Sequence, residues 1–299
     1  MEFKSKTMKV TRYGIALLVL TLGLWSCGSK KDNNENSDEF KQAEESLTDE
    51  IKDVENNLPS PTEIPYLLQA TGAEFNQSLL NDKKKVDSYL TRNDKAALNL
   101  GVYASDIGYL VSYDKTQEAI DYVTASKKLA NGLGVLGTFD QEVLKRFEKN
   151  IAQKDSLTEL VNDAIKQTEK YLKSDNRIKP AALMIAGSFI EGLYISTGLI
   201  KSYPKDLKEQ DRMLVLTPLI RVVLQQRESI DDLVKMLSGV EQTEPVISIL
   251  EQLNSLEGSY RALNIEERIK NNQTDQILKD KNLADITSTV EKLRKSIVD

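Results

Sequence analysis

Two carboxylates, Asp106 and Glu191, stand out because each lies near the middle of a long apolar stretch. Asp106 belongs to residues 96–110 and Glu191 to residues 181–195, and Glu191 is the only charged side chain in the run 180–200. An unpaired ionised carboxylate in an apolar interior costs several kcal/mol. Each acid is therefore expected to be paired with a cation, strongly hydrogen-bonded or protonated.

Three interpretations of these acids are open. In the first, Glu191 forms a buried ion pair with Arg221, which lies in the apolar run 219–224, and the pair fixes the register of two helices. In the second, the acids line a cavity for a cationic or hydroxylated ligand, and the candidate ligand-binding residues are Asp106, Tyr103, Tyr109, Glu191, Tyr194 and Arg221. In the third and least favoured, the two carboxylates are the acid pair of a hydrolase, although the chain beyond residue 26 contains no Trp to stack on a sugar.

The chain contains no His and a single Cys. The usual general base near neutral pH and the commonest ligand of transition metals are therefore both absent. This excludes Ser-His-Asp catalysis, Cys-His catalysis and His-based zinc sites. A metal site made of Asp106 and Glu191 alone would be a carboxylate-only site and is less favoured still. We predict no catalytic residues, no bound metal and no cofactor.

Helices must position the two acids, because no segment alternates with period two as a strand would. In both apolar stretches Ala-Ala-Leu is followed at the same spacing by an acid and then by Tyr three residues later, which indicates an internal duplication around 96–110 and 181–195. A projection of 100° per residue places the small residues of 97–108, Gly101 among them, on one smooth face suited to close helix approach. The expected fold is all-α: a multi-helix bundle or an irregular superhelical array of antiparallel helix pairs.

The N-terminus has the features of a bacterial lipoprotein signal. A basic start is followed by the 12-residue apolar run 14–25, which is too short to span a bilayer as a helix. The run ends in Leu24-Trp25-Ser26-Cys27, which resembles a lipobox, so residues 1–26 are expected to be a signal peptide and Cys27 the site of lipid attachment. Acyl chains such as palmitate would then anchor the protein to a membrane. An ordinary secretory signal with a chance Cys is the alternative.

Beyond the signal, composition divides the chain into three parts. Residues 27–37 are polar and are expected to form a disordered tether. Residues 38–58 carry an apolar stripe at heptad-like spacing on a charged background, which predicts an amphipathic helix that either docks on the body or forms a stalk or dimer zipper. A Pro-Ser-Pro sequence marks the next boundary. Residues 59–299 are expected to form an all-helical domain that begins with a capping box of Ser60 and Glu63.

The segment Ala97-Leu98-Asn99-Leu100-Gly101-Val102-Tyr103-Ala104-Ser105-Asp106 resembles a motif in a group of uncharacterised lipoproteins of the Bacteroidota. The resemblance covers most of the mature chain. It implies a lipid-anchored envelope protein with an all-helical body and brings no known activity. Gly28 follows the Cys, which by analogy with other Gram-negative lipoproteins favours the outer membrane and leaves its periplasmic or surface face open.

The charge balance excludes one class of partner. The formal net charge is −6, and removal of residues 1–26, which hold four basic residues and one acidic residue, leaves −9. This balance argues against nucleic acid as the main partner. The favoured function is a non-catalytic protein that is anchored to the outer membrane through Cys27 and contacts another envelope protein. A small-ligand-binding lipoprotein is the alternative, and a carboxylate-pair hydrolase is less favoured.

Overall fold

The computed structural model describes residues 58–135, 141–150, 153–203, 209–264, 268, 274–277 and 280–299. All of them belong to the second of two units into which the chain divides, residues 42–299. None of the described residues lies in a β-strand and most are helical, which confirms the all-α prediction. The predicted signal peptide, Cys27, the tether and all but Leu58 of the predicted 38–58 helix lie outside the described residues.

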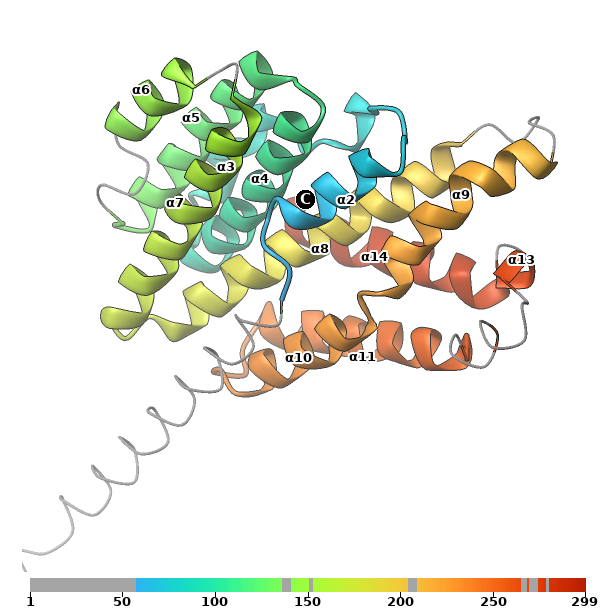
Figure 1. The fold of residues 1–299 in the computed structure, drawn as a ribbon. Coiled ribbons are helices and arrows are strands. Elements are labelled where there is room, and N and C mark those ends of the chain that lie inside the picture. Colours follow the sequence, from blue (N-terminus) through green and yellow to red (C-terminus); the bar gives the residue numbers. More distant parts are fainter. Residues whose placement is uncertain are drawn as a thin grey trace, which may run out of the picture. The chain divides into compact units, whose positions relative to one another are not determined.

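The described part of residues 42–299 is built from helices that differ widely in length. They are α2 (Glu63–Ala70), the 3₁₀ helices η1 (Gln77–Leu79) and η2 (Lys83–Lys85), α3 (Val86–Tyr89), α4 (Asn93–Ser112), α5 (Thr116–Gly132), α6 (Gln141–Lys149), α7 (Lys154–Ser174), α8 (Ile178–Ser202), α9 (Glu209–Leu224), α10 (Arg227–Ser238), α11 (Val246–Ala262), α13 (Thr274–Ile277) and α14 (Lys281–Val298). In Figure 1, α8 crosses the middle of these helices, with α2 in front of it and α14 behind it.

The two predicted acid-bearing stretches form α4 and α8, the centre of the core. Both helices are apolar around almost their whole circumference, which is the pattern of a fully buried helix. Every residue of α4 from Ala96 to Ser112 is buried, and so is the 181–199 part of α8 apart from Ile185 and Tyr194. α5, α7, α2 and α14 pack around α4, while α14, α9, α7, α2 and α10 pack around α8.

Two glycines bring the backbones of α4 and α8 into contact. A Cβ atom on Gly101 would collide with the carbonyl oxygen of Met184, and one on Gly187 would collide with the carbonyl oxygen of Leu98. Only a residue without a side chain allows this approach at these positions. The predicted smooth face of α4 therefore does contact another helix at Gly101, and that helix is α8.

α4 and α8 run in the same direction. Gly101 lies against Met184 and Ser188, and further along both helices Gly192 lies against Ser105. Positions about 85 residues apart thus face each other across the contact, as expected if 96–110 and 181–195 are equivalent. The internal duplication itself stays a prediction.

The start of α2 keeps half of the predicted capping box. The N–H of Ser60 donates to Oε2 of Glu63 at 3.3 Å. The reciprocal bond, from the N–H of Glu63 to the Ser60 hydroxyl, is replaced by a bond from that N–H to the Ser60 carbonyl at 3.0 Å, and Thr62 rather than Ser60 is the N-cap residue of α2. The boundary predicted at residue 59 therefore leads directly into the first described helix.

α8 is the one helix of the described ranges that is long and apolar enough to cross a membrane, and 83% of its most apolar 18-residue window is buried inside the protein. Such burial is typical of the core helix of a globular domain. Its central position in the packing accounts for the apolar composition without a bilayer.

Candidate functional site

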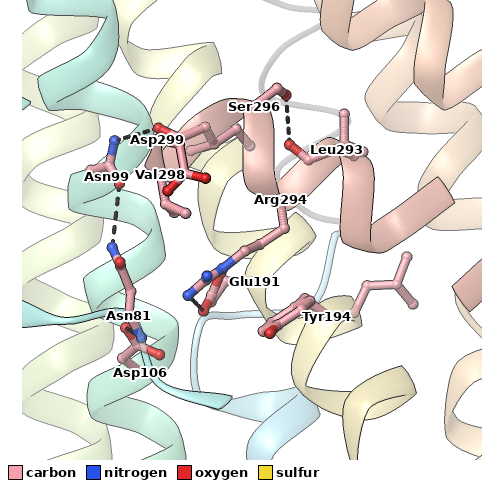
Figure 2. Close-up of polar contacts among 12 residues, drawn as sticks. Asn81, Asn99, Asp106, Glu191, Tyr194, Leu293, Arg294, Ser296, Val298 and Asp299 are labelled. Atoms are coloured by element: carbon pink, nitrogen blue, oxygen red, sulfur yellow. Dashed lines mark hydrogen bonds and ion pairs between the residues drawn. The ribbon is translucent and has the colours of Figure 1, made fainter. Parts of the chain in front are cut away.

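Glu191, at the middle of α8, is fully buried and forms an ion pair with Arg294 of α14. Nε of Arg294 donates to Oε2 of Glu191 at 3.1 Å and Nη2 donates to Oε1 at 3.2 Å (Figure 2). Two parallel charge-assisted bonds fix the orientation of both side chains. The prediction of Arg221 as the partner is wrong, because Arg221 is exposed on α9. The apolar residues next to it in sequence are buried and pack on the core.

Tyr194 covers the guanidinium of Arg294. Tyr194 lies about one turn beyond Glu191 on α8, and the centroid of its ring is 4.5 Å from Cζ of Arg294. This places a cation over an aromatic face as well as against a carboxylate. Burial lowers the pKa of Arg294, but the charge and hydrogen bonds of Glu191 outweigh it and raise the pKa overall. Arg294 is therefore a permanent cation, and 15% of its side chain remains exposed.

Asp106 of α4 is also fully buried and faces Glu191. Its Oδ2 accepts the backbone N–H of Asn81 at 3.2 Å, while Oδ1 accepts no hydrogen bond from an N–H or O–H group of the described residues. The Asp106 and Glu191 carboxyl groups are within hydrogen-bonding reach of each other. Two carboxylates are both acceptors, so a bond between them requires one proton.

Of the two acids, Asp106 has the surroundings that favour the protonated form more strongly. Burial raises its pKa well above the ordinary value, and the charge of the neighbouring Glu191 raises it further. Burial also raises the pKa of Glu191, but the cation and hydrogen bonds of Arg294 oppose that shift. With Asp106 protonated, Glu191 ionised and Arg294 charged, the three side chains have no net charge. We call these three residues the acid cluster.

Asn81 ties the acid cluster to the surrounding helices. Besides the bond from its N–H to Asp106, its Oδ1 accepts the hydroxyl of Tyr89 at 3.1 Å and its carbonyl accepts the hydroxyl of Tyr122 at 2.8 Å. Its Nδ2 donates to Oδ1 of Asn99 at 3.4 Å. Because all these groups are buried, each bond offsets a desolvation cost that would otherwise destabilise the core.

The end of α14 is bound by the same network. Nδ2 of Asn99 donates to the carbonyl of Ile297 at 3.0 Å, and the hydroxyl of Tyr89 donates to the carbonyl of Val298 at 3.0 Å. The final carbonyls of a helix have no partner within the helix. Side chains of α3 and α4 therefore supply what the last turn of α14 lacks.

The two tyrosines of α4 that were candidates for a ligand pocket are fully buried core residues. The hydroxyl of Tyr103 donates to the carbonyl of Asp82 at 3.1 Å, and the hydroxyl oxygen of Tyr109 accepts the N–H of Asn76 at 2.8 Å. Burial raises the pKa of Tyr109 to about 12 and raises that of Tyr103 as well. Both hydroxyls are neutral and engaged with backbone groups, so they present no open polar face.

Neither of two clefts on the described part of the protein is lined by the acids. The first, about 560 Å³, lies between the end of α8 and the start of α14 and is lined by Ile200, Lys201, Asp280, Lys281, Leu283, Ala284, Thr287, Ser288 and Glu291. The second, about 250 Å³, lies between the segment before α2, α7 and α8 and is lined by Leu58, Pro59, Ser60, Pro61, Glu63, Asn162, Ile165, Lys166, Glu169, Ile185, Ser188 and Phe189. The lining residues include none of the candidate ligand-binding residues.

The acid cluster contains two of the six candidate site residues, Asp106 and Glu191, and a third, Tyr194, covers its arginine. Tyr103 lies beside it, Tyr109 bonds elsewhere and Arg221 is on the surface. The arrangement does not suit acid-pair hydrolysis, which needs about 5–9.5 Å between the carboxyl groups so that a sugar or water fits. Two carboxyl groups within hydrogen-bonding reach of each other leave no such space.

Arg294 and Asn81 are the members of the network that sequence reasoning missed. A signal for Arg294 exists in α14, whose buried residues Val290 and Ile297 lie within about 60° of it at 100° per residue. A charged residue on the apolar stripe of a helix is a candidate for a buried pair. Asn81 has no comparable signal, because it lies in the segment between η1 and η2 and half of its bonds are made by its backbone groups.

Comparisons with protein-family models, with curated proteins and with solved structures found no match. Within the described ranges, no group of three or more His, Cys, Asp or Glu residues is placed to hold a metal ion.

Proposed function

We propose that this protein is a non-catalytic, lipid-anchored module of the bacterial outer membrane that contacts another envelope protein through its helical surfaces. The observation that carries this proposal is the closure of the acid cluster. Both acids are fully buried and bonded to groups of the same chain, and neither lines either of the two clefts. This favours a structural role for the residues that were the best candidates for ligand binding or catalysis.

The anchor is proposed from the lipobox sequence that ends at Cys27. Metabolic labelling with an alkyne analogue of palmitate should mark the wild-type protein, and a Cys27→Ala variant should remain unlabelled and leave the membrane fraction. Separation of inner and outer membranes would then locate the labelled protein. Equal labelling of the wild type and Cys27→Ala would refute the anchor without affecting the interpretation of the helical domain.

A contact with another protein is supported by large apolar side chains exposed on α2 and α9, two helices that pack against each other. Tyr66 of α2 is 54% exposed, Leu214 of α9 is 79% exposed and Leu67 of α2 is also exposed. Aromatic and aliphatic side chains of this kind are typical of the centre of a protein interface. The acidic charge of the chain favours a protein partner over an anionic membrane surface or nucleic acid.

Site-specific photo-crosslinking in living cells tests this part of the proposal. A benzoyl-phenylalanine at position 66 or 214 should crosslink to the same envelope protein, whereas the same group in place of Glu159, which is exposed on α7, should not. The crosslink should be lost when Cys27→Ala releases the protein from the membrane. A small molecule that copurifies at one equivalent, with no crosslink at position 66 or 214, would instead support a ligand-binding lipoprotein.

A further inference from the structure

The acid cluster has more acidic groups than basic groups, so its net charge depends on whether one acid is protonated. It contains two carboxyl groups and one guanidinium, and both carboxyl groups have no exposed surface. The cluster is neutral only while one acid keeps a proton. If both acids ionise, a net negative charge is left in the core, and burial of a net charge is strongly unfavourable.

The same cluster holds the end of α14 in place. Arg294 is the residue through which α14 reaches the acids, and the remaining polar contacts of this end are hydrogen bonds to main-chain carbonyls and exposed ion pairs. Those carbonyls accept from Asn99, Tyr89, Lys85 and Lys95, and Lys85 also pairs with Asp299. Exposed ion pairs contribute little, about 0–1 kcal/mol. The buried contact of Arg294 with Glu191 is therefore the strongest polar link at this end of the helix.

We propose that residues 291–299 of α14 form a proton-linked latch: the proton shared by Asp106 and Glu191 keeps this end of α14 closed on α4 and α8, and loss of the proton loosens it. The device is a conformational response to pH built into the helical domain. It does not depend on the lipid anchor or on a partner protein, so it can fail or succeed independently of the proposed function.

The other ionisable groups around the two acids do not supply the missing charge. The tyrosines that face the pair come from α3, α4, α5 and α8, and burial raises the pKa of each of them, so they stay neutral: Tyr89, Tyr103, Tyr122 and Tyr194. On the remaining neighbours, Glu63 of α2 and Arg221 of α9 are exposed, Glu169 of α7 pairs with Lys173, and Glu291 of α14 pairs with Lys201. Arg294 is thus the charged group that acts on the pair.

The direction of the pH dependence follows from the raised pKa of Asp106, which burial causes first and the charge of Glu191 second. A carboxyl group with a raised pKa in the folded state binds its proton more tightly there than in the unfolded chain. Its contribution to stability is complete below the ordinary carboxyl pKa of about 4 and is lost as pH rises through the folded-state value. Mild acid should therefore close the latch and alkaline pH should open it.

The sharpest variant is Asp106→Asn in the full-length chain. Asn keeps the shape of a protonated Asp, accepts from Asn81 and donates to Glu191 without a titrating proton. The infrared spectrum of the wild type at pH 7 should contain a carboxylic-acid band that Asp106→Asn lacks. Between pH 5 and pH 8 the folding constant of the wild type should fall at least tenfold relative to that of Asp106→Asn, since one proton changes it by up to tenfold per pH unit.

Hydrogen exchange locates the effect. At pH 9 the amides of residues 291–299 should exchange at least tenfold faster in the wild type than in Asp106→Asn, and at pH 6 the two should agree within twofold; comparison at one pH cancels the intrinsic rates. The amides of α10 should not differ between the proteins at either pH. Equal exchange of residues 291–299 at pH 9, equal acceleration in α10, or absence of the acid band would each overturn the proposal.

A second variant protects the test if Asp106→Asn does not fold. In Glu191→Gln the remaining acid, Asp106, balances Arg294 without an extra proton, so the pH dependence should again be reduced at least tenfold between pH 5 and pH 8. A Glu191→Gln profile that runs parallel to the wild type would contradict a shared proton.

Discussion

The contact between α4 and α8 is made in two different ways along its length. At Gly101 and Gly187 the two backbones touch, and the contact depends on the absence of side chains. At Asp106 and Glu191, about one and a half turns further along α4, two acids lie between the helices and a cation from α14 is needed to balance them. The first contact is complete within the helix pair, and the second requires a third helix.

The two contacts specify the fold in different ways, one through shape and the other through charge. The glycine contact fixes how close α4 and α8 lie, because any larger residue would force the backbones apart. The acid cluster fixes which further helix can pack there, because only a helix that brings a cation neutralises the pair. A buried ion pair contributes less to stability than its geometry suggests, since desolvation opposes the attraction. Its value here lies in selecting α14.

The largest expected effect comes from removing the cation. Arg294→Met leaves Glu191 buried without its partner, and the cost should be about 3–5 kcal/mol in the free energy of unfolding. Lys201→Met is the matched control, because Lys201 and Glu291 also join α8 and α14 but are exposed, so that variant should lose at most about 1 kcal/mol. Urea denaturation followed by circular dichroism measures both. Similar losses would erase the distinction between the acid cluster and a surface pair.

Truncation of the acid should cost somewhat less and should depend on what replaces it. Glu191→Ala removes the partner of Arg294 and leaves a cavity, with an expected loss of about 3 kcal/mol. Glu191→Gln keeps the volume and can still accept one of the two bonds from Arg294, and ionised Asp106 can balance Arg294, so about 1 kcal/mol is expected. Thermal and urea unfolding of the two variants give the comparison. Two stable variants that have lost uptake of a small ligand would identify a binding site instead.

Substitution at the glycine contact tests the other end. Gly101→Ala and Gly187→Ala each place a methyl group against a main-chain carbonyl of the facing helix, and a loss of about 1–3 kcal/mol is expected from overpacking. Gly258→Ala in α11 is the control, because no heavy atom lies within 4 Å of its new Cβ. It should stabilise the protein by roughly 0.5–1 kcal/mol through helix propensity. If Gly101→Ala and Gly187→Ala raised the free energy of unfolding as Gly258→Ala does, the backbones of α4 and α8 would not be in contact.

The smallest effect is expected from the ring that covers the cation. Tyr194→Leu keeps most of the apolar volume but removes the aromatic face over Arg294, at a cost of about 1 kcal/mol. In an Arg294→Met background the same change should cost less, since the cation is gone, and a double-mutant cycle by urea denaturation measures the difference. An unchanged cost in that background would show that Tyr194 contributes through packing alone.

The sequence predicts the glycine contact better than the acid cluster, for a physical reason. Small residues at helical spacing identify a close-packed face from one segment alone, and Gly101 does contact another helix. The solitary charge of Glu191 likewise predicts burial and a partner. The identity of that partner depends on which distant helix lies alongside α8, and a single sequence does not contain that information.

The mistaken choice of Arg221 illustrates this limit. Apolar neighbours along the chain favoured it, but exposure in a helix is decided by the angular position of a residue, and Arg221 lies on the outer face of α9. Arg294 has charged neighbours in sequence yet lies close to the apolar stripe of α14. The expected ligand-binding role of Tyr103 and Tyr109 failed for the same reason. Both are buried by the distant helices that surround α4.

Glu191 and Arg294 are separated by 103 residues along the chain. A ribosome that adds about 5–20 residues per second needs about 5–20 s to make that interval. During this time the nascent α4 and α8 are both available, but the arginine that neutralises them has not yet been made. Packing of α14 is therefore a late step in folding during synthesis. Until Arg294 is available, hydration of the two acids is favoured over their burial.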